Sequence, residues 1–419
     1  MKKTVMFCLV FLCISACACF ANGYKILGVK STKATGMGEA FIVQADNPTA
    51  IAFNPAGITQ LKGTQATVDG TLTTSWTKHI SPEGDEQDMI GKWHLVPGIF
   101  LTSDLGMKNF AVGLGVTVPN GISTEWPSES FARYVATFSD LRVIDINPSA
   151  AYKFNEHFSI GGGLSFYYSE SVADNRTDYG QLIGAPGKMD GKNHMKGKGY
   201  GWGYNCGGIF KLNDRHSFAA TFKSPYKITY KGKTELSSIP AVLGMGTFIE
   251  SDVESSLKFP AVVVVGYAFH PTDRLKLEFN LDWTRWDTVK TVGMRFSDSS
   301  LTDAEFKYDY NNTFAYKTGL EYLFTDTFRL RGGYIFNEKA VPENTWRPSL
   351  VDTDTHFICS GFGWDIGKFT LDGACQVIIY ADRTIDNNVD NNETISSSTI
   401  DGKYETFAIG FSLSLSYRF

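Results

Sequence analysis

The last residues of the chain, TFAIGFSLSLSYRF (406–419), decide the fold, because apolar side chains alternate there with small or polar ones. The apolar set is Phe407, Ile409, Phe411, Leu413, Leu415, Tyr417 and Phe419. A period of two residues is that of a β-strand with one apolar and one polar face. At about 3.3 Å per residue, such a strand crosses a bilayer even when tilted, whereas strands of soluble proteins average about 5–6 residues. The pattern therefore favours a transmembrane strand.

The same alternation recurs along most of the chain, for example over 64–76, 158–168 and 275–284. It predicts about fourteen strands, near 64–76, 92–104, 107–119, 138–154, 156–171, 197–212, 215–232, 254–270, 273–294, 304–324, 326–338, 354–366, 367–382 and 404–419. An even number suits a single-chain bacterial barrel, whose closure leaves no exposed sheet edge. Short polar turns such as Asn155-Glu156 are expected on the periplasmic side, and longer connections such as 172–196 outside. We therefore predict an all-β membrane protein, a fourteen-stranded antiparallel barrel over 63–419.

The first residues have the pattern of a secretion signal, over 1–21. Lys2 and Lys3 precede a short apolar stretch and then small residues, which predicts cleavage after Ala21. Ile14-Ser15-Ala16-Cys17 leaves lipidation at Cys17 as the alternative. The apolar stretch is too short for a membrane-spanning helix.

The segment 22–62 does not alternate like the rest of the chain. It contains Gly36-Met37-Gly38 and Asn54-Pro55-Ala56, which are typical of irregular, turn-rich backbone. Asn bonds its own backbone, while Pro fixes φ and withholds a donor, so Asn54-Pro55 predicts a turn. An irregular piece ahead of a closed barrel fits best inside it, so we predict a plug, or hatch, with Asn54, Pro55 and Ala56 as its seating motif.

Composition excludes several other classes of protein. A net charge of −5 without a basic cluster argues against a nucleic-acid binder. Cys206, Cys359 and Cys375 have no metal-ligand spacing and read as strand residues. Neither H-E-x-x-H nor G-x-S-x-G occurs. We expect no catalytic residues, no metal site and no cofactor.

Several blocks of the chain resemble the FadL/TodX family of outer-membrane transporters for long-chain fatty acids and other hydrophobic compounds. These are Gly23-Tyr24, Gly36-Met37-Gly38 and Asn54-Pro55-Ala56-Gly57, then Trp126-Pro127 with Ala132-Arg133-Tyr134, Asp282-Trp283-Thr284-Arg285-Trp286, and Leu330-Arg331-Gly332-Gly333-Tyr334 with Val341-Pro342. The resemblance implies a fourteen-stranded barrel with an N-terminal hatch and uptake by passive diffusion. It also implies that the aromatic ring of Tyr24 lines the inner pocket and moves when the hatch opens.

The third strand contains residues that break a regular ladder, namely Gly113, Gly115 and Pro119. By resemblance, a kink here opens the wall laterally toward the membrane, a sensible exit for an apolar ligand. The alternative is a plain strand end followed by turn residues.

The loop after this strand carries Trp126, Phe131, Tyr134 and Phe138. Exposed aromatic side chains there would form a groove that captures a hydrophobic ligand. The alternatives are packing of the loop against its neighbour, or a place in the interfacial aromatic belt.

A carboxylate ligand needs a cation in an otherwise apolar pocket. Lys317, Arg329 and Arg331 are expected to face the lumen by alternation, with Lys317 and Arg331 as the candidate contacts. The alternative is a structural ladder of ion pairs with Glu278, Asp282 or Glu321.

Three functions compete at this stage. The first is a hatch-gated channel for hydrophobic molecules, either fatty acids or aromatic hydrocarbons. This function accounts for the plug, the aromatic loop and the break in the third strand together. A general porin has no use for a plug, and a lipid-modifying enzyme needs a catalytic set that no motif supplies. The partners expected are the ligand, outer-membrane lipids and the barrel-assembly machinery, which would engage the strand ending in Phe419. We expect a monomer.

Overall fold

The computed structural model describes residues 23–419, except 245, 388 and 390–398. The expected signal segment, with Ala21 and Cys17, lies outside the described residues. In the described part, no helix has the length and apolar character needed to cross a membrane.

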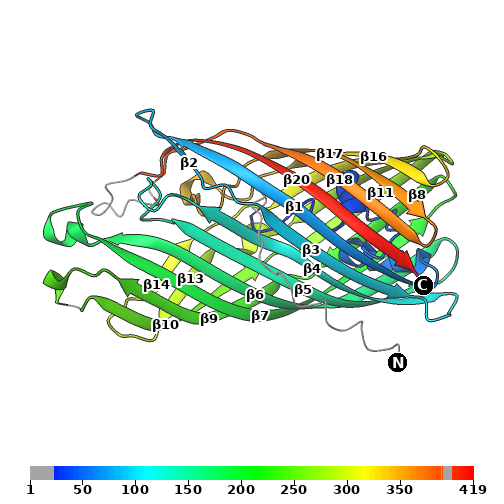
Figure 1. Ribbon diagram of the computed structural model, residues 1–419. Coiled ribbons are helices and arrows are strands. Elements are labelled where there is room, and N and C mark those ends of the chain that lie inside the picture. Colours follow the sequence, from blue (N-terminus) through cyan, green and yellow to red (C-terminus); the bar gives the residue numbers. More distant parts are fainter. Residues whose placement is uncertain (1–22, 245, 388, 390–398) are drawn as a thin grey trace, which may run out of the picture.

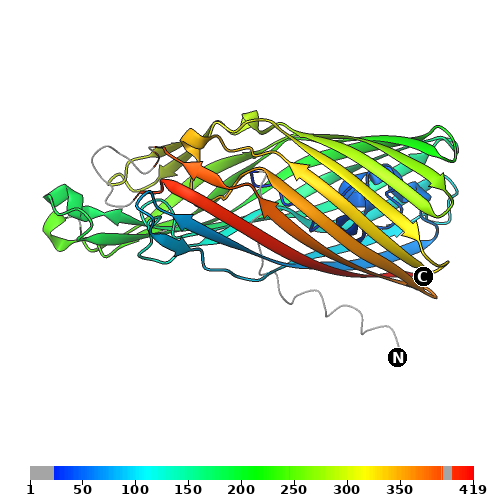
Figure 2. The same cartoon turned by 90° about the horizontal axis from the view of Figure 1, so that it is seen from above.

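The described chain forms one closed antiparallel barrel (Figures 1 and 2). Nine wall strands are single elements: β1 (Thr64–Ile80), β3 (His94–Ser103), β4 (Phe110–Glu125), β5 (Phe138–Lys153), β6 (Phe158–Asp178), β7 (Asp190–Lys211), β16 (Phe328–Asn337), β17 (Thr355–Ile366) and β20 (Gly402–Arg418). Five more consist of two pieces each: β8 (His216–Lys223) with β9 (Tyr226–Ser237), β10 (Phe248–Phe259) with β11 (Val262–Thr272), β12 (Leu275–Thr284) with β13 (Thr291–Phe296), β14 (Ala304–Lys307) with β15 (Thr313–Leu323), and β18 (Phe369–Tyr380) with β19 (Arg383–Ile385). The first and last strands, β1 and β20, pair from Gln65↔Arg418 to Ile80↔Lys403 and close the barrel. The prediction of a closed fourteen-stranded barrel is confirmed.

The two-piece strands differ from the continuous strands expected at 215–232, 254–270, 273–294 and 304–324. Pro225 separates β8 from β9 and Pro260 separates β10 from β11, because proline cannot donate to a ladder. In the third case the turn η4 (Trp286–Thr288) leaves the wall between β12 and β13. The same two wall strands stay paired on both sides of these breaks: β8 pairs with β11, and β9 pairs with β10.

The ladder between β3 and β4 covers less than half of β4. It runs only from Ser103↔Val112 to Ile99↔Val116. Just beyond it, β4 has an irregularity against β5 between Thr117 and Asn120. Three steps along β4 there match two along β5, which is a β-bulge with one extra residue.

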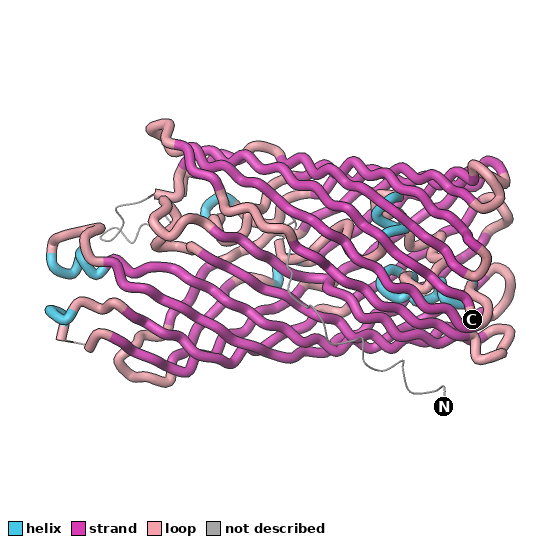
Figure 3. Tube along the Cα trace, viewed as in Figure 1, coloured by secondary structure: helices cyan, strands magenta, loops and turns pink. Residues whose placement is uncertain are grey.

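Inside one half of the barrel lie the three short helices of the N-terminal segment (Figures 2 and 3): α1 (Thr32–Gly36), α2 (Ala50–Phe53) and η1 (Pro55–Gln60). Nearly every described residue from Gly23 to Ile58 is buried. Ser31 accepts from the Ala34 N–H and caps α1, and Asn54 accepts from the Ala56 N–H and caps η1. We call this segment, residues 23–62, the plug.

The remaining elements decorate the ends of the wall. The short strand β2 (Glu86–Asp88) pairs with the end of β1. Three turns lie in the connections: η2 (Tyr179–Ile183), η3 (Ala241–Leu243) and η5 (Glu343–Thr345). Apolar side chains such as Val68 and Leu413 project outward, while the inward faces carry Thr, Ser and charged residues. Cys206, Cys359 and Cys375 are free thiols within strands.

Candidate functional site

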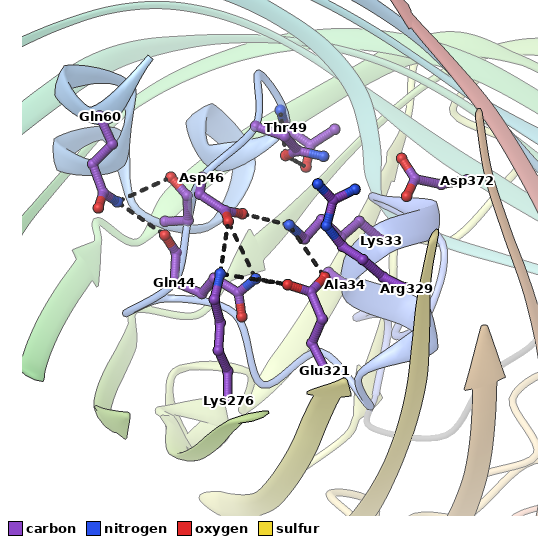
Figure 4. Close-up of polar contacts among 12 residues, drawn as sticks. Lys33, Ala34, Gln44, Asp46, Thr49, Gln60, Lys276, Glu321, Arg329 and Asp372 are labelled. Atoms are coloured by element: carbon purple, nitrogen blue, oxygen red, sulfur yellow. Dashed lines mark hydrogen bonds and ion pairs between the residues drawn. The ribbon is translucent and has the colours of Figure 1, made fainter. Parts of the chain in front are cut away.

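The plug is tied to one side of the barrel by a network of buried and partly buried charges (Figure 4). Lys33 of α1 contacts Asp46 of the plug at 2.7 Å and Glu321 of β15 at 3.4 Å. Lys276 of β12 reaches the same two carboxylates at 3.5 Å each. Gln44 adds a hydrogen bond of 2.9 Å to Glu321. Isolated buried charges are costly, so this mutual pairing fixes the plug in one position.

A second buried network lies nearer the plug's N-terminus. The Nζ atoms of Lys25 and Lys317 share one oxygen of Asp282, at 3.0 and 2.8 Å. Lys317 also contacts Glu39 of the plug at 3.1 Å. Burial lowers the pKa of Lys25 to about 8, with Asp282 opposing that shift. Burial disfavours the charged form of Glu39, but Lys30 and Lys317 hold its pKa below the ordinary value.

Glu278 of β12 binds the plug backbone directly. Its two carboxylate oxygens accept from the N–H groups of Val43 and Gln44, both at 2.8 Å. On β1, Asp69 accepts from the Thr32 N–H at the start of α1, at 2.7 Å. These bonds satisfy plug N–H groups that lie outside any strand ladder.

Glycines in the wall allow the plug to approach closely. A Cβ on Gly333 would lie 2.0 Å from the Gly38 nitrogen, and one on Gly319 would lie 2.3 Å from the Met37 oxygen. On the other side of the barrel, a Cβ on Gly161 would lie 2.5 Å from the backbone of Pro55 and Ala56. Only glycine fits at such a distance.

The start of the plug pairs with the bulge of β4. The Ile26 N–H donates to the Pro119 oxygen at 3.1 Å, and the Tyr24 oxygen accepts from the Gly121 N–H at 3.0 Å. The Asn120 side chain also donates to the Tyr24 oxygen, at 3.2 Å. The plug therefore supplies hydrogen-bond partners to β4 just where its ladder with β3 has ended.

Asp352, in the connection before β17, holds the first described residue. One of its oxygens accepts from the Gly23 N–H at 3.2 Å, and the other accepts from Ala340 and Val341, each at 2.7 Å. Burial raises the pKa of Asp352, against these hydrogen bonds. The beginning of the plug is thus bound both to the wall and to a long connection.

Two cavities lie on either side of this N-terminal contact. The outer one is mainly apolar and is lined by Tyr24, Ile122, Tyr230 and Leu257, among others. The inner one is bordered by Tyr226 and Phe259 and by six charged residues, Lys25, Lys30, Lys223, Lys317, Glu39 and Asp282. Four lysines against two carboxylates leave the inner cavity with an excess of positive charge.

Aromatic rings form the boundary between the cavities. Tyr226 stacks on Tyr167 at 3.7 Å and on Phe259 at 4.6 Å between ring centroids. Tyr24 lies 6.4 Å from Phe259 and 6.2 Å from Tyr310. Tyr24 lines the outer cavity, on the other side of this boundary from the inner pocket that the resemblance implied.

The aromatic side chains of the third-strand loop pack against their neighbours. Trp126 is only 2% exposed and lies edge-on to Phe131, and Phe131 stacks on His79. Tyr134 donates to Asp190 at 2.8 Å, and Phe138 lies beneath the ammonium group of Lys92. This arrangement matches the packing alternative instead of an exposed capture groove.

The three lumenal cations have different surroundings. Lys317 lines the inner cavity and is ion-paired there. Arg331 contacts Glu321 at 2.8 Å and Asp372 at 2.6 Å, away from the residues that border either cavity in the described chain. Arg329 contacts Asp365 at 2.6 Å. The ion pairs of Lys317 with Asp282 and of Arg331 with Glu321 match the structural ladder that the sequence left open as an alternative. For Arg331, these ion pairs take the place of the expected ligand contact.

Gly113 and Gly115 do not border the interruption of the wall. They pair with Thr102 and Phe100 of β3, and a Cβ on either would meet the Ile51 side chain of the plug. Of the three residues expected at a lateral opening, Pro119 alone lies in the bulge.

The sequence did not single out Lys30, Glu39 and Asp352, and it considered Asp282 only as part of a motif and as a possible ion-pair partner of the lumenal cations. Glu39 directly follows the Gly36-Met37-Gly38 motif. A carboxylate beside this tight turn was the feature of the sequence that could have pointed to Glu39. Across the described residues, no group of three or more His, Cys, Asp or Glu side chains is placed to hold a metal ion.

A closed barrel with a plug bound in its lumen defines the class of the protein, a plugged outer-membrane channel. The family model described as "Outer membrane protein transport protein (OMPP1/FadL/TodX)" matches residues 12–419. The chain therefore belongs to this family and is an outer-membrane protein.

Curated relatives and solved structures agree with this assignment. The long-chain fatty acid transport protein of Salmonella typhi is 23% identical over 80% of this chain and 82% of its own length. That of Escherichia coli K12 is 22% identical, over 80% and 83%. The crystal structure of a Pseudomonas aeruginosa FadL homologue has a TM-score of 0.83 at 19% identity, covering 95% of this chain and all of the other. The toluene transporter TbuX of Ralstonia pickettii has a TM-score of 0.70 at 16% identity, over 92% and 97%.

Proposed function

We propose that this chain is a passive channel that takes up hydrophobic carboxylates, long-chain fatty acids above all, through a hatch-gated path with lateral exit at the third strand. One observation carries the proposal. The residues that start the plug, Tyr24 and Ile26, bind the bulge of β4 at the point where the β3–β4 ladder has stopped. Movement of the plug's first residues and exposure of the gap in the wall are therefore a single event.

The two cavities support a two-stage path. Apolar side chains around the outer cavity suit a hydrocarbon chain that arrives from the long-loop end. Tyr24 and Asn120 lie between the cavities, so a shift of Tyr24 would join them. Beyond them, the bulge of β4 offers the route sideways into the bilayer.

The charge of the inner cavity favours an acid over a neutral hydrocarbon. Lys30 of the plug makes a cation–π contact of 5.1 Å with Phe53, and no ion pair within 4 Å forms to it among the described residues. Lys223 at the end of β8 lines the same cavity. A carboxylate between Lys30 and Lys223 would gain charge-assisted hydrogen bonds in a poorly hydrated space. Lys317, already held by Asp282, contributes to the positive potential.

Deleting Pro119 tests the lateral exit. The deletion removes the extra residue of the bulge, so Thr117 and Asn120 become separated by the same number of steps as Asp145 and Val143. A regular β4 can then pair with β3 along more of its length. We expect fatty-acid uptake, measured in a host without its own channel, to fall about tenfold or more.

The control for this deletion is Pro148→Ala, which changes a proline of β5 that faces outward and lies at no register shift. Both variants must show the altered electrophoretic mobility of a folded barrel on heating. Full uptake by a folded Pro119 deletion would refute lateral exit.

Ligand chemistry is tested by comparing a fatty acid with its methyl ester. The double variant Lys30→Gln, Lys223→Gln should bind the acid about tenfold more weakly or worse, because two charge-assisted contacts are lost. Binding of the ester should change little. The matched control is Lys62→Gln with Lys108→Gln, two exposed lysines at the short-turn end. Equal losses of affinity for the acid and the ester would show that the two lysines do not recognise the carboxylate.

A general porin and a lipid-modifying enzyme remain the alternative classes. The packed, ion-paired plug favours a low steady conductance in a planar bilayer, whereas an open porin would give a large one. We propose a non-enzymatic role, a monomeric state, and assembly through the C-terminal strand ending in Phe419.

A further inference from the structure

A polar pocket of about 280 Å³ lies in the outer wall, between β10 and β13. These strands pair over only three residues, from Val253↔Phe296 to Ser255↔Met294. Below them, η4 carries the chain out of the sheet, and the lower part of β10 faces the pocket. The volume is several times the ~30 Å³ of a water molecule in the liquid. It therefore admits a group of the size of a phosphate.

Three cations line this pocket: Lys227 of β9, Lys258 of β10 and Arg295 of β13. Glu254 is the acidic residue among its lining, which also includes the hydroxyl residues Ser255, Ser256, Thr288 and Thr291. The basic residues thus exceed the acidic one, and hydroxyl donors are present as well. Such a set is complementary to a phosphate group, which Arg binds in a bidentate manner and Lys as a point charge.

Like charges face each other across these strands. Lys227 is the register partner of Lys258, and Lys198 of β7 is the partner of Lys231. Directly opposed like charges destabilise a sheet. Lys231 contacts Glu254 at 3.5 Å, but within the described residues no ion pair involves Lys227, Lys258 or Lys198. An anion bound from outside would relieve this repulsion.

The outward face of β7 places the pocket at the level of the lipid head groups. Phe210, Tyr204, Trp202 and Tyr200 project outward in turn, with Trp202 and Tyr200 exposed by 72% and 71%. From Phe210 to Tyr200 a tilted strand rises about 25 Å, which is the height of the apolar band in outer-membrane barrels.

Tyr200 and Trp202 therefore belong to the aromatic belt at the long-loop end. Tyr200 pairs with Thr229, so Lys227, two residues before Thr229 in β9, lies opposite Trp202. β7 begins at Asp190 and β9 ends at Ser237, so both strands continue beyond this level toward that end.

We propose that this wall pocket binds a phosphate group of a phosphorylated lipid in the outer leaflet. Lys227, Lys258 and Arg295 contact the phosphate, and Trp202 and Tyr200 pack against the lipid beside it. Lys198 stands above the pocket, where it adds to the attraction of an anionic head group. Its three cations are exposed on the outer face of the wall, whereas Ser255 and Val292 of the same lining also border the outer cavity.

The experiment compares lipid binding by the double variant Lys227→Gln, Lys258→Gln with that of the unchanged protein. The mature protein is purified from outer membranes in mild detergent and titrated with a bisphosphorylated lipid of the lipid A class, with native mass spectrometry as the readout. A lysine near an anionic lipid surface contributes about 1 kcal/mol, so losing two should weaken binding roughly 30-fold. Arg295→Gln should weaken it further.

Two controls make the outcome decisive. The periplasmic-end pair Lys62→Gln, Lys108→Gln, with the same change of net charge, should bind the lipid as the unchanged protein does. The dephosphorylated form of the same lipid should bind the unchanged protein as weakly as the phosphorylated lipid binds the double variant. Unchanged affinity in the folded double variant, an equal loss in the control pair, or phosphate-independent binding would each overturn the proposal.

Discussion

The plug meets two sides of the barrel in different ways. Toward β12 and β15 it is held by buried charges, with Asp282, Glu278 and Glu321 as the wall's contributions. Toward β4 through β7 it packs by shape, with Ile51 against Gly113 and the Asn54-Pro55-Ala56 turn against Gly161 and Gly207. Buried ion pairs resist separation, because parting them leaves charges uncompensated, whereas an apolar contact can slide.

This difference assigns a direction to any movement of the plug. The ion-paired side acts as the anchor, and the apolar side lies next to the interrupted ladder of β3 and β4. A ligand that displaces Tyr24 would therefore disturb the contact with β4 before it disturbs the anchor. In the proposed mechanism, the plug opens the wall locally without leaving the lumen.

Removing the anchor should have the largest effect on this arrangement. Asp282→Ala leaves Lys25 and Lys317 without their shared acceptor, and breaking a buried pair in this way costs about 3–5 kcal/mol. We expect the plug to undock, which would be measured as a rise in ion conductance in planar bilayers and as cleavage of residues 23–62 by added protease.

The matched control for the anchor is Asp287→Ala. Asp287 contacts Arg285 at 3.2 Å on an exposed turn, and such surface pairs contribute only about 0–1 kcal/mol. Its conductance should stay at the level of the unchanged protein. If Asp282→Ala also stays there, the charges do not hold the plug.

A smaller effect is expected on the packed side. In Gly161→Ala, the new methyl group would overlap the backbone of Pro55 and Ala56, and relieving such overlap costs about 1–3 kcal/mol. Conductance should rise less than in Asp282→Ala. Gly208→Ala is the control, because the nearest atom to its Cβ is the Ser159 oxygen at an ordinary 3.5 Å. Equal behaviour of the two glycine variants would show that close packing at Gly161 is not needed.

The two sides also differ in how far the sequence predicts them. The alternation within a strand depends only on which of its side chains meet lipid. Each of the fourteen strands could therefore be predicted separately from its own sequence. The anchor was not, because Lys25 and Asp282 are 257 positions apart and their pairing depends on where the plug sits. Likewise, Gly113 was predicted as a wall break, but its reason is the Ile51 side chain that it accommodates. The aromatic loop shows the same limit. Composition indicated Trp126 and Phe131, whereas the burial of Trp126 and the partial burial of Phe131 follow from packing around Tyr404.

The seating turn offers the finest test of the comparison. Asn54 donates to the Ile42 oxygen at 2.8 Å within the plug and to the Gly208 oxygen at 3.3 Å in the wall, and it accepts from the Ala56 N–H at 3.1 Å. Asn54→Ala loses a cap and leaves carbonyl groups without these donors, at a cost of about 1–2 kcal/mol. Amide exchange over residues 42–60 should speed up several-fold, with little change in conductance.

Asn47→Ala is the matched control for this last variant. Asn47 accepts from Thr49 inside the plug, at 3.1 Å to its N–H and 2.6 Å to its hydroxyl group. Losing it should speed exchange near Thr49 but not across the turn at 54–56. Should both variants loosen the whole plug equally, its stability would come from internal bonds alone. A selective effect of Asn54→Ala would instead show that the packed side is held by a few directed bonds, weak enough to release while the charged side keeps the plug in the barrel.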